Sequence, residues 1–293
     1  MTIRARAHAW LELARISNLP TVWTNALVGV ALGSEGVGLS AGRAGLAVVA
    51  LSFLYIGGMV LNDAFDATRD ASVRSGRPIP SGRIGRVPAF AVGGTLLALG
   101  VATLTPAGPM AIAAGGALAA VILLYDWLHH LAPITVALMG VCRGGAYVVA
   151  AAAAGGVVDS RGLIVCAVGM TVYVIALTVL ARSEHTSERR VGVMLAGVVL
   201  PVPLLAAAVL LPSPVSWAAP TFVAVVLAGW IWHATRLTAT EPPQPVAAVM
   251  GWLAAICLAD VLFLVRLDEP VAAAVAAGCF VVTVAGHRVV LGS

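Results

Sequence analysis

Ten apolar stretches, each about as long as a membrane-spanning helix, follow one another along this chain. They lie near residues 17–33, 45–64, 87–105, 109–128, 133–155, 161–182, 191–211, 215–235, 246–265 and 270–289. A helix needs about 20 mostly apolar residues to cross the bilayer core, whereas a barrel strand needs only about 10. The stretches therefore predict an all-α, polytopic transmembrane bundle of nine to ten spans, folded as one domain over residues 1–293.

The composition excludes the other broad classes of protein. Of the 293 residues, 60% are hydrophobic and only 10% are charged, whereas soluble domains carry about 25% charged residues. The chain is too apolar for a disordered segment. Its four cysteines all lie inside apolar stretches and lack the spacing of a metal site or a disulfide framework.

The positions of the arginines predict the orientation in the membrane. All 17 basic residues are arginines, and short arginine clusters between apolar stretches are typical of cytoplasmic loops rather than of nucleic-acid binding. With a cytoplasmic N-terminus, the inner side holds Arg4, Arg6, Arg15, Arg69, Arg74, Arg77, Arg83, Arg86, Arg182, Arg189, Arg190, Arg236 and Arg288, and the outer side holds only Arg43, Arg161 and Arg266. This asymmetry indicates a multi-pass protein of the cell (inner) membrane, and the bias toward alanine and arginine suggests a bacterium.

Residues 1–16 form a separate feature ahead of the first span. They mix charged and apolar side chains, and we expect an amphipathic helix at the inner membrane surface with Trp10, Leu11 and Leu13 toward lipid.

A cluster of acidic residues ends the second span. Asp63, Asp66 and Asp70 stand at i, i+3 and i+7, so a continuing helix places all three on one face. Asn62 shares that face approximately. Like charges so close repel one another unless cations lie among them, and hard oxygen ligands suit Mg²⁺, which also binds phosphate oxygens.

A second acidic pair, Glu184 and Glu188, ends the sixth span on the same predicted side of the membrane. Two acidic faces at one depth can hold a pyrophosphate between them through metal. The loop after the first cluster adds Arg74 and Arg77, whose guanidinium groups match phosphate oxygens. Two simpler interpretations stay open: ordinary cytoplasmic loop charges for the arginines, and a solvated helix end for the acidic stripe, with Asp66 paired to Arg69.

These residues carry a resemblance to a known family. The run Asn62-Asp63-x-x-Asp66-x-x-x-Asp70, followed by Arg74 and by Arg77-Pro78-Ile79-Pro80-Ser81-Gly82-Arg83, resembles the first signature of the UbiA-type intramembrane prenyltransferase superfamily. The second half departs from the family pattern. Glu184 and Glu188 stand at aspartate positions, Leu177 stands at an upstream aspartate position, and histidines follow Tyr125 where a basic pair is common.

The resemblance implies an all-α fold around a central cavity open to the cytoplasm. It also implies Mg²⁺-dependent transfer of a prenyl group from a prenyl diphosphate to a lipid-soluble acceptor, an aromatic or other small molecule. We expect metal ligands and catalytic residues at Asp63, Asp66, Asp70, Glu184 and Glu188, and substrate-binding residues at Asn62, Arg74, Arg77, Asn18, Tyr125, His129 and Arg143. Tyr125, Asp126, His129 and His185 are candidates to take the acceptor's proton.

Two ionisable residues inside apolar stretches have separate interpretations. Arg143 lies within the fifth stretch, where a charge is a functional-site hypothesis by default, although snorkelling to the inner surface is equally compatible with its position. Asp260 lies within the ninth stretch; Arg266 is a candidate partner for it, and no role is assigned to Asp260.

Two rival functions remain open. A small-molecule transporter would also bury ionisable residues among many helices, but it favours charges near mid-membrane in both halves. A non-catalytic UbiA-like protein that binds a prenyl lipid is favoured by the glutamates and by Leu177.

Overall fold

The structure, a computed structural model, describes residues 2–34, 39–128, 132–156, 160–183 and 190–288, and their regular elements are all helical. The helices are α1 (Ile3–Leu13), α2 (Leu19–Gly33), α3 (Ala41–Val73), α4 (Arg86–Thr103), α5 (Pro109–Leu128), α6 (Ala132–Ala153), α7 (Arg161–Ser183), α8 (Arg190–Val199), α9 (Val202–Leu210), α10 (Ala218–Arg236), α11 (Pro245–Arg266) and α12 (Pro270–Gly286). A short 3₁₀ turn, η1 (Ile16–Asn18), precedes α2. The predicted all-α class is confirmed.

Each predicted apolar stretch contains helix in the structure. Eight helical segments of the described chain are long and apolar enough to cross a bilayer, and α12 is a shorter apolar helix. The seventh stretch is two helices, because the helix breaks before Pro201, which cannot donate a backbone hydrogen bond. The first stretch yields only the 15 residues of α2. The chain is an integral membrane protein.

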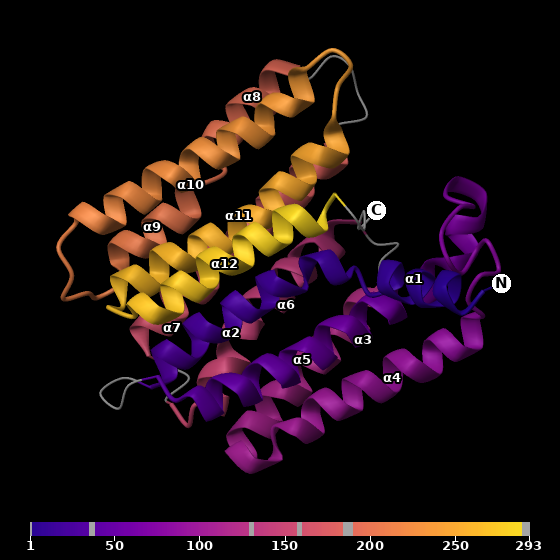
Figure 1. Cartoon of the computed structure of the whole chain (residues 1–293), viewed down its shortest axis with the longest axis horizontal. Coiled ribbons are helices and arrows are strands. Elements are labelled where there is room, and N and C mark those ends of the chain that lie inside the picture. Colours follow the sequence, from indigo (N-terminus) through magenta and orange to yellow (C-terminus); the bar gives the residue numbers. More distant parts are fainter. Residues whose placement is uncertain (1, 35–38, 129–131, 157–159, 184–189, 289–293) are drawn as a thin grey trace.

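Helix α2 lies at the centre of the arrangement and packs against α3, α6, α11 and α12. In Figure 1, α8, α9 and α10 lie along one side of the bundle and α4 along the opposite side. The N-terminal helix α1 and the loop that follows α3 lie together at one end, on the right of that view. The acidic cluster of α3 points to this same end.

Close contact between α2 and α6 depends on glycine. A Cβ atom at Gly29 would lie 2.5 Å from the carbonyl oxygen of Tyr147 and 2.5 Å from Cβ of Ala150. Small residues permit this approach between helices in lipid. The two backbones therefore touch where the sequence provides no side chain.

Replacing Gly29 with valine is expected to lower the free energy of unfolding by about 1–3 kcal/mol, because the side chain overpacks this contact. Thermal unfolding in detergent measures the effect. Gly94→Val is the matched control, since a Cβ atom there meets nothing within 4 Å. Equal unfolding temperatures for the two variants would contradict the proposed packing.

Helix α1 differs from the expectation of a lipid-facing amphipathic helix. Leu13 is fully buried and packs with Ala9 against Val60 of α3 and against Ile79 and Ile84 of the following loop, with Trp10 partly buried beside them. The prediction that Leu13 faces lipid is therefore wrong, whereas Leu11 is exposed. The isolated helix pattern could not show that the loop after α3 folds back to cover this face.

Candidate functional site

The acidic stripe lies on one continuous helix, since α3 runs on to Val73. Asp63 and Asp70 are buried, at 6% and 7% exposure, and Asp66 is half-buried. Asp63 and Asp70 are seven residues apart, almost two turns, so their side chains leave the same face. The predicted common face is confirmed for Asp63 and Asp70, because both carboxylates contact the same guanidinium group, that of Arg77.

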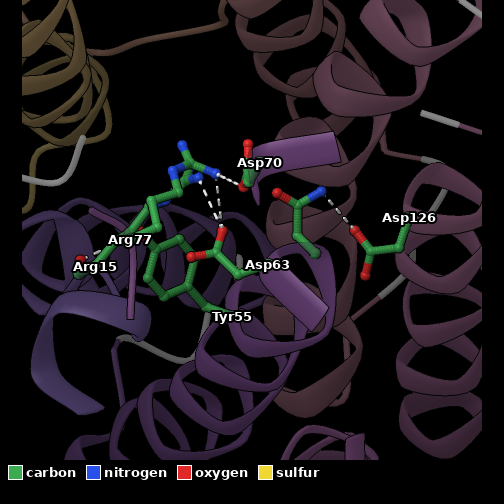
Figure 2. A network of polar contacts seen from close by, with 7 residues as sticks. Arg15, Tyr55, Asp63, Asp70, Arg77 and Asp126 are labelled. Carbon is green, nitrogen blue, oxygen red and sulfur yellow. Dashed lines mark hydrogen bonds and ion pairs between the residues drawn. The ribbon is translucent and has the colours of Figure 1, made fainter. Parts of the chain in front are cut away.

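Arg77 lies between the two buried carboxylates (Figure 2). Its Nη1 donates to Oδ2 of Asp70 at 2.7 Å and to Oδ1 of Asp63 at 3.4 Å. A guanidinium group thus supplies the positive charge that the acidic stripe requires, and Arg77 itself is only 8% exposed.

The loop between α3 and α4 holds Arg77 in this position. The backbone turns back on itself, with hydrogen bonds from Ser81 N to Arg77 O at 3.0 Å and from Ile84 N to Pro78 O at 3.0 Å. Arg83 ties the loop to α1 through both carboxylate oxygens of Glu12, at 2.8 and 3.3 Å. The folded loop brings an arginine from beyond the helix end onto the helix face.

Arg15 is a second cation at the stripe, and sequence analysis did not assign it to the site. Its Nη2 lies 3.5 Å from Oδ1 of Asp63. The residue joins α1 to η1 with φ of 44° and ψ of 48°, a left-handed conformation that is uncommon for a residue other than glycine. Because this turn sets the direction of the side chain, residue spacing alone gave no signal for it.

Asn62 and Asp126 connect the stripe to α5. The Nδ2 of Asn62 donates to Oδ1 of Asp126, which Figure 2 labels, at 3.1 Å. Both side chains are buried. Asn62 therefore bonds across to α5 in this structure. It holds a further buried carboxylate, Asp126, beside the acidic stripe.

A cavity of about 280 Å³ adjoins this cluster. Its walls are mostly aliphatic and come from α2, α3, α5, α6, α7 and α11, with Leu177 on one side. The polar groups on its lining include Arg15, Asn18, Tyr55, Tyr125, Asp126 and Arg143. An apolar chamber with a few polar groups is the usual form of a small-molecule site.

Asn18 is fixed at the edge of the cavity by the far end of the chain. Nε2 of His287, just beyond α12, lies 2.7 Å from Oδ1 of Asn18. Burial lowers the pKa of His287 below its ordinary value, so the ring is neutral at neutral pH and its Nε2–H donates to the amide oxygen.

Asp260 has partners that sequence analysis did not foresee. It accepts hydrogen bonds from the Thr24 hydroxyl, the Tyr147 hydroxyl and, at 2.7 Å, Nδ2 of Asn25. Its predicted pairing with Arg266 is wrong. Arg266 instead donates to the carbonyl oxygens of Ala208, Leu211 and Val215 and stacks on Trp217.

The remaining predicted site residues divide into two groups. Arg74 is exposed at the C-cap of α3, and its side chain bonds no other described residue. Glu184, Glu188, His129 and His185 lie outside the described residues. The sharing of one site by the two acidic clusters thus stays a prediction.

The described residues fit a divalent cation in their chemistry but do not by themselves enclose one. Carboxylates are the ligands Mg²⁺ prefers, and Asp63 and Asp70 converge on a single positive group. Within the described ranges, no three His, Cys, Asp or Glu side chains form a metal-binding cluster. Further ligands would have to come from outside these ranges or from substrate.

Comparisons with known proteins identify the family of the chain and agree with its fold. Residues 22–283 match the UbiA prenyltransferase family. The chain is 38% identical over 121 residues to a digeranylgeranylglyceryl phosphate synthase of Methanopyrus kandleri, covering 41% of this chain and 43% of that protein. It is 36% identical over 126 residues to the protein of the same name from Ignicoccus hospitalis, covering 43% of this chain and 40% of that protein. These matches therefore span about two fifths of the curated relatives.

Solved structures share the fold at low sequence identity. One, described as a digeranylgeranylglyceryl phosphate synthase, is 18% identical with a TM-score of 0.61 and covers 90% of this chain and 99% of its own. A UbiA homologue from Archaeoglobus fulgidus, bound to GPP and Mg²⁺, is 13% identical with a TM-score of 0.55 and covers 89% of this chain and 99% of its own. The family match extends over most of the chain, and the fold agrees with it. The chain belongs to the UbiA prenyltransferase family.

Proposed function

We propose that this protein transfers a prenyl group from a prenyl diphosphate to a lipid-soluble acceptor inside the membrane, with Mg²⁺. The observation that carries the proposal is the buried stripe of Asp63 and Asp70 with Arg77 between them, next to an apolar cavity. Family membership supports it, as do relatives named for synthesis of a prenylated glyceryl phosphate.

The diphosphate binds at the acidic stripe in this proposal. Asp63, Asp66 and Asp70, together with Glu184 and Glu188, are the groups that would hold Mg²⁺, and bound Mg²⁺ would supply positive charge to the leaving diphosphate. Arg77 and the exposed Arg74 donate to the remaining phosphate oxygens. Arg77 bonds both carboxylates without a ligand, so it exchanges a carboxylate partner for a phosphate partner on binding.

The chain's own residues then favour breaking of the allylic C–O bond. Arginine side chains stabilise the negative charge that grows on the leaving diphosphate, which is the main electrostatic requirement of the reaction. The aliphatic cavity walls hold the prenyl tail and exclude water, so that the allylic cation meets the acceptor's nucleophilic atom rather than water.

Asp126 is our preferred group for taking the acceptor's proton. It lines the cavity and is fixed by Asn62 beside the stripe. Because the Asn62 amide fixes the orientation of this carboxylate, Asp126 can accept a proton from an acceptor in the cavity. It does not belong to the group of carboxylates that we assign to the diphosphate. Tyr125 lines the same wall and hydrogen-bonds the acceptor in this scheme.

The arginine asymmetry supports a site that faces the cytoplasm, in a bacterial inner membrane. The residues of the stripe and of the loop after α3 belong to the arginine-rich side. A charged, water-soluble leaving group can escape from that side, whereas the prenylated product leaves sideways into lipid.

The test uses purified protein in lipid nanodiscs with labelled prenyl diphosphates of several chain lengths, a lipid extract as the acceptor, and either Mg²⁺ or EDTA. We expect pyrophosphate release with Mg²⁺, none with EDTA, recovery when Mg²⁺ is restored, and a loss of about 100-fold or more in Asp66→Ala. Binding of the diphosphate without any release would instead favour the non-catalytic prenyl-lipid-binding protein. Release that survives EDTA would contradict the metal requirement.

A further inference from the structure

Tyr55 of α3 is an aromatic side chain at the point where the acidic stripe meets the cavity. The residue is half-buried and lines the cavity. Its hydroxyl donates to the carbonyl oxygen of Arg15 at 3.4 Å, and Nη2 of the same arginine lies 3.5 Å from Oδ1 of Asp63. Figure 2 shows Tyr55 in one cluster with these two residues. Tyr55 therefore belongs to the stripe and to the cavity wall at once.

The Tyr55 hydroxyl is held by the protein itself. It donates to the backbone of Arg15, and the Asn18 side chain also hydrogen-bonds it. Asn18 is fixed in turn by His287. A hydroxyl with these partners is not free to act on a substrate as an acid or a base. The part of the side chain that remains for a ligand in the cavity is the aromatic ring.

The ring of Tyr55 has no stacking partner among the described residues. No second aromatic ring packs on it there and no arginine lies over it, although arginines stack on Phe90 and on Trp217 elsewhere in the bundle. The electron-rich face of an aromatic ring attracts a cation within about 6 Å of its centre, most strongly where water is excluded. The face of Tyr55 is thus available to a cation in the cavity.

The position along α3 places this ring just inside the cavity from the diphosphate site. Tyr55 precedes Asp63 by eight residues, which is about 12 Å of helical rise, and the two side chains leave the helix about 80° apart. Because the hydroxyl reaches back to Arg15, the ring occupies the interval between the stripe and the deeper aliphatic walls. A prenyl diphosphate bound at the stripe places the first carbons of its chain in this interval.

Tyr125 lines the cavity as well but differs from Tyr55 in its hydroxyl. That hydroxyl bonds none of the residues that the structure describes, so it is free for the acceptor. The two tyrosines therefore offer different chemistry to the cavity. Tyr125 offers a hydrogen-bonding group, and Tyr55 offers a ring whose polar end is already occupied.

We propose that the ring of Tyr55 stabilises the allylic cation of the prenyl-transfer reaction through a cation–π interaction. This inference rests on the proposed function and adds a catalytic residue to the same site. The bond between the first prenyl carbon and the diphosphate oxygen breaks, and its electron pair leaves with the diphosphate. The positive charge, shared by the allylic carbons, lies over the ring. A lone pair of the acceptor then forms the new bond to the first carbon, and the acceptor's proton passes to Asp126.

The test measures binding of a cationic probe and of its neutral isostere, so that it does not depend on turnover. The probes are geranyltrimethylammonium and the hydrocarbon in which carbon replaces the nitrogen. The protein is held in nanodiscs of zwitterionic lipid with Mg²⁺ and inorganic pyrophosphate, and binding to empty nanodiscs is subtracted. We expect the wild-type protein to bind the cationic probe about 10-fold or more tightly, because aromatic faces recognise quaternary ammonium groups.

A series of substitutions at Tyr55 separates the ring from other sources of this preference. Tyr55→Phe and its mono-, di- and trifluorinated forms all lack the hydroxyl and are similar in size, and each fluorine withdraws negative charge from the ring face. We expect the preference for the cationic probe to fall in steps along the series, by about 10-fold in total, and to fall as far in Tyr55→Leu. Binding of the neutral probe should stay constant. A purely structural role would give no stepwise dependence on fluorine.

The same substitutions at Tyr173 of α7 are the matched control. Tyr173 is fully buried, donates to the carbonyl oxygen of Trp252 at 2.7 Å and is not part of the cavity wall. Its series should leave the preference for the cationic probe unchanged. The inference is overturned if the preference is equal across a folded Tyr55 series, or if the wild-type protein binds the two probes alike.

Pyrophosphate release from labelled prenyl diphosphates by the wild-type protein is measured in parallel. Release, combined with a probe preference that ignores the fluorines, refutes the role of Tyr55 and leaves prenyl transfer standing. Absence of release with every chain length refutes the proposed function itself.

Discussion

Replacing Asp63 with asparagine is expected to lower Mg²⁺-dependent pyrophosphate release by about 100-fold or more, with little change in the size of the side chain. Asp63 is the carboxylate on which Arg15 and Arg77 converge, at 3.5 and 3.4 Å. The asparagine side chain lacks the negative charge that both arginines face. The substitution also removes one proposed metal ligand. Turnover at saturating prenyl diphosphate, measured over a range of Mg²⁺ concentrations, checks the prediction.

The control for this variant is Asp268→Asn, which makes the same chemical change at an exposed position after α11. Its turnover should equal that of the wild type. In Asp63→Asn, Arg77 keeps its contact with Asp70 at 2.7 Å, which holds the loop in place. We therefore expect an unfolding temperature close to that of the wild type, and this measurement separates a loss of catalysis from a loss of folding. A turnover of Asp63→Asn within threefold of the wild type would refute the assignment of the stripe as the diphosphate site.

The helical class and the acidic face could be predicted because each depends on neighbours in sequence. Apolar length alone separates membrane helices from strands. The i, i+7 spacing of Asp63 and Asp70 requires a common face if the helix continues, and α3 does continue past them. Both inferences use only the geometry of a single helix.

The groups that surround the stripe could not be predicted in the same way. Arg15 reaches Asp63 from 48 residues away, through a left-handed turn, and Asp126 reaches Asn62 from 64 residues away. Such contacts depend on how separate helices pack, and residue spacing within one helix carries no information about that. The resemblance identified the motif on α3 and Arg77 of the following loop, but not the contact of Arg15 with Asp63 or that of Asn62 with Asp126.

The mistaken pairing of Asp260 with Arg266 has a simple geometric cause. Six residues along a helix correspond to about 600°, so the two side chains leave α11 in directions about 120° apart rather than on a common face. Arg266 accordingly reaches the carbonyl oxygens at the end of α9, which helix geometry leaves without partners. Asp260 faces inward to α2 and α6 instead.

Asp260→Asn is expected to lower the free energy of unfolding by roughly 2–4 kcal/mol, the largest stability effect we predict for a single buried polar side chain here. The carboxylate accepts from Thr24, Asn25 and Tyr147, all fully buried. An amide offers one acceptor oxygen, and its NH₂ group meets a donor in place of the other. Interhelical hydrogen bonds in membranes average only about 0.6 kcal/mol each, so the donors left without acceptors account for most of the loss.

Unfolding in detergent measures this loss. The separate single variant Asp268→Asn, at an exposed position, is the control. Because the network of Asp260 lies among α2, α6 and α11 and not at the stripe, binding of a prenyl diphosphate analogue at the stripe should change little in the folded variant. An Asp260→Asn protein that unfolds at the same temperature as the wild type and Asp268→Asn would show that the network does not support the bundle. The buried carboxylate would then have no function in the arrangement described for α2, α6 and α11.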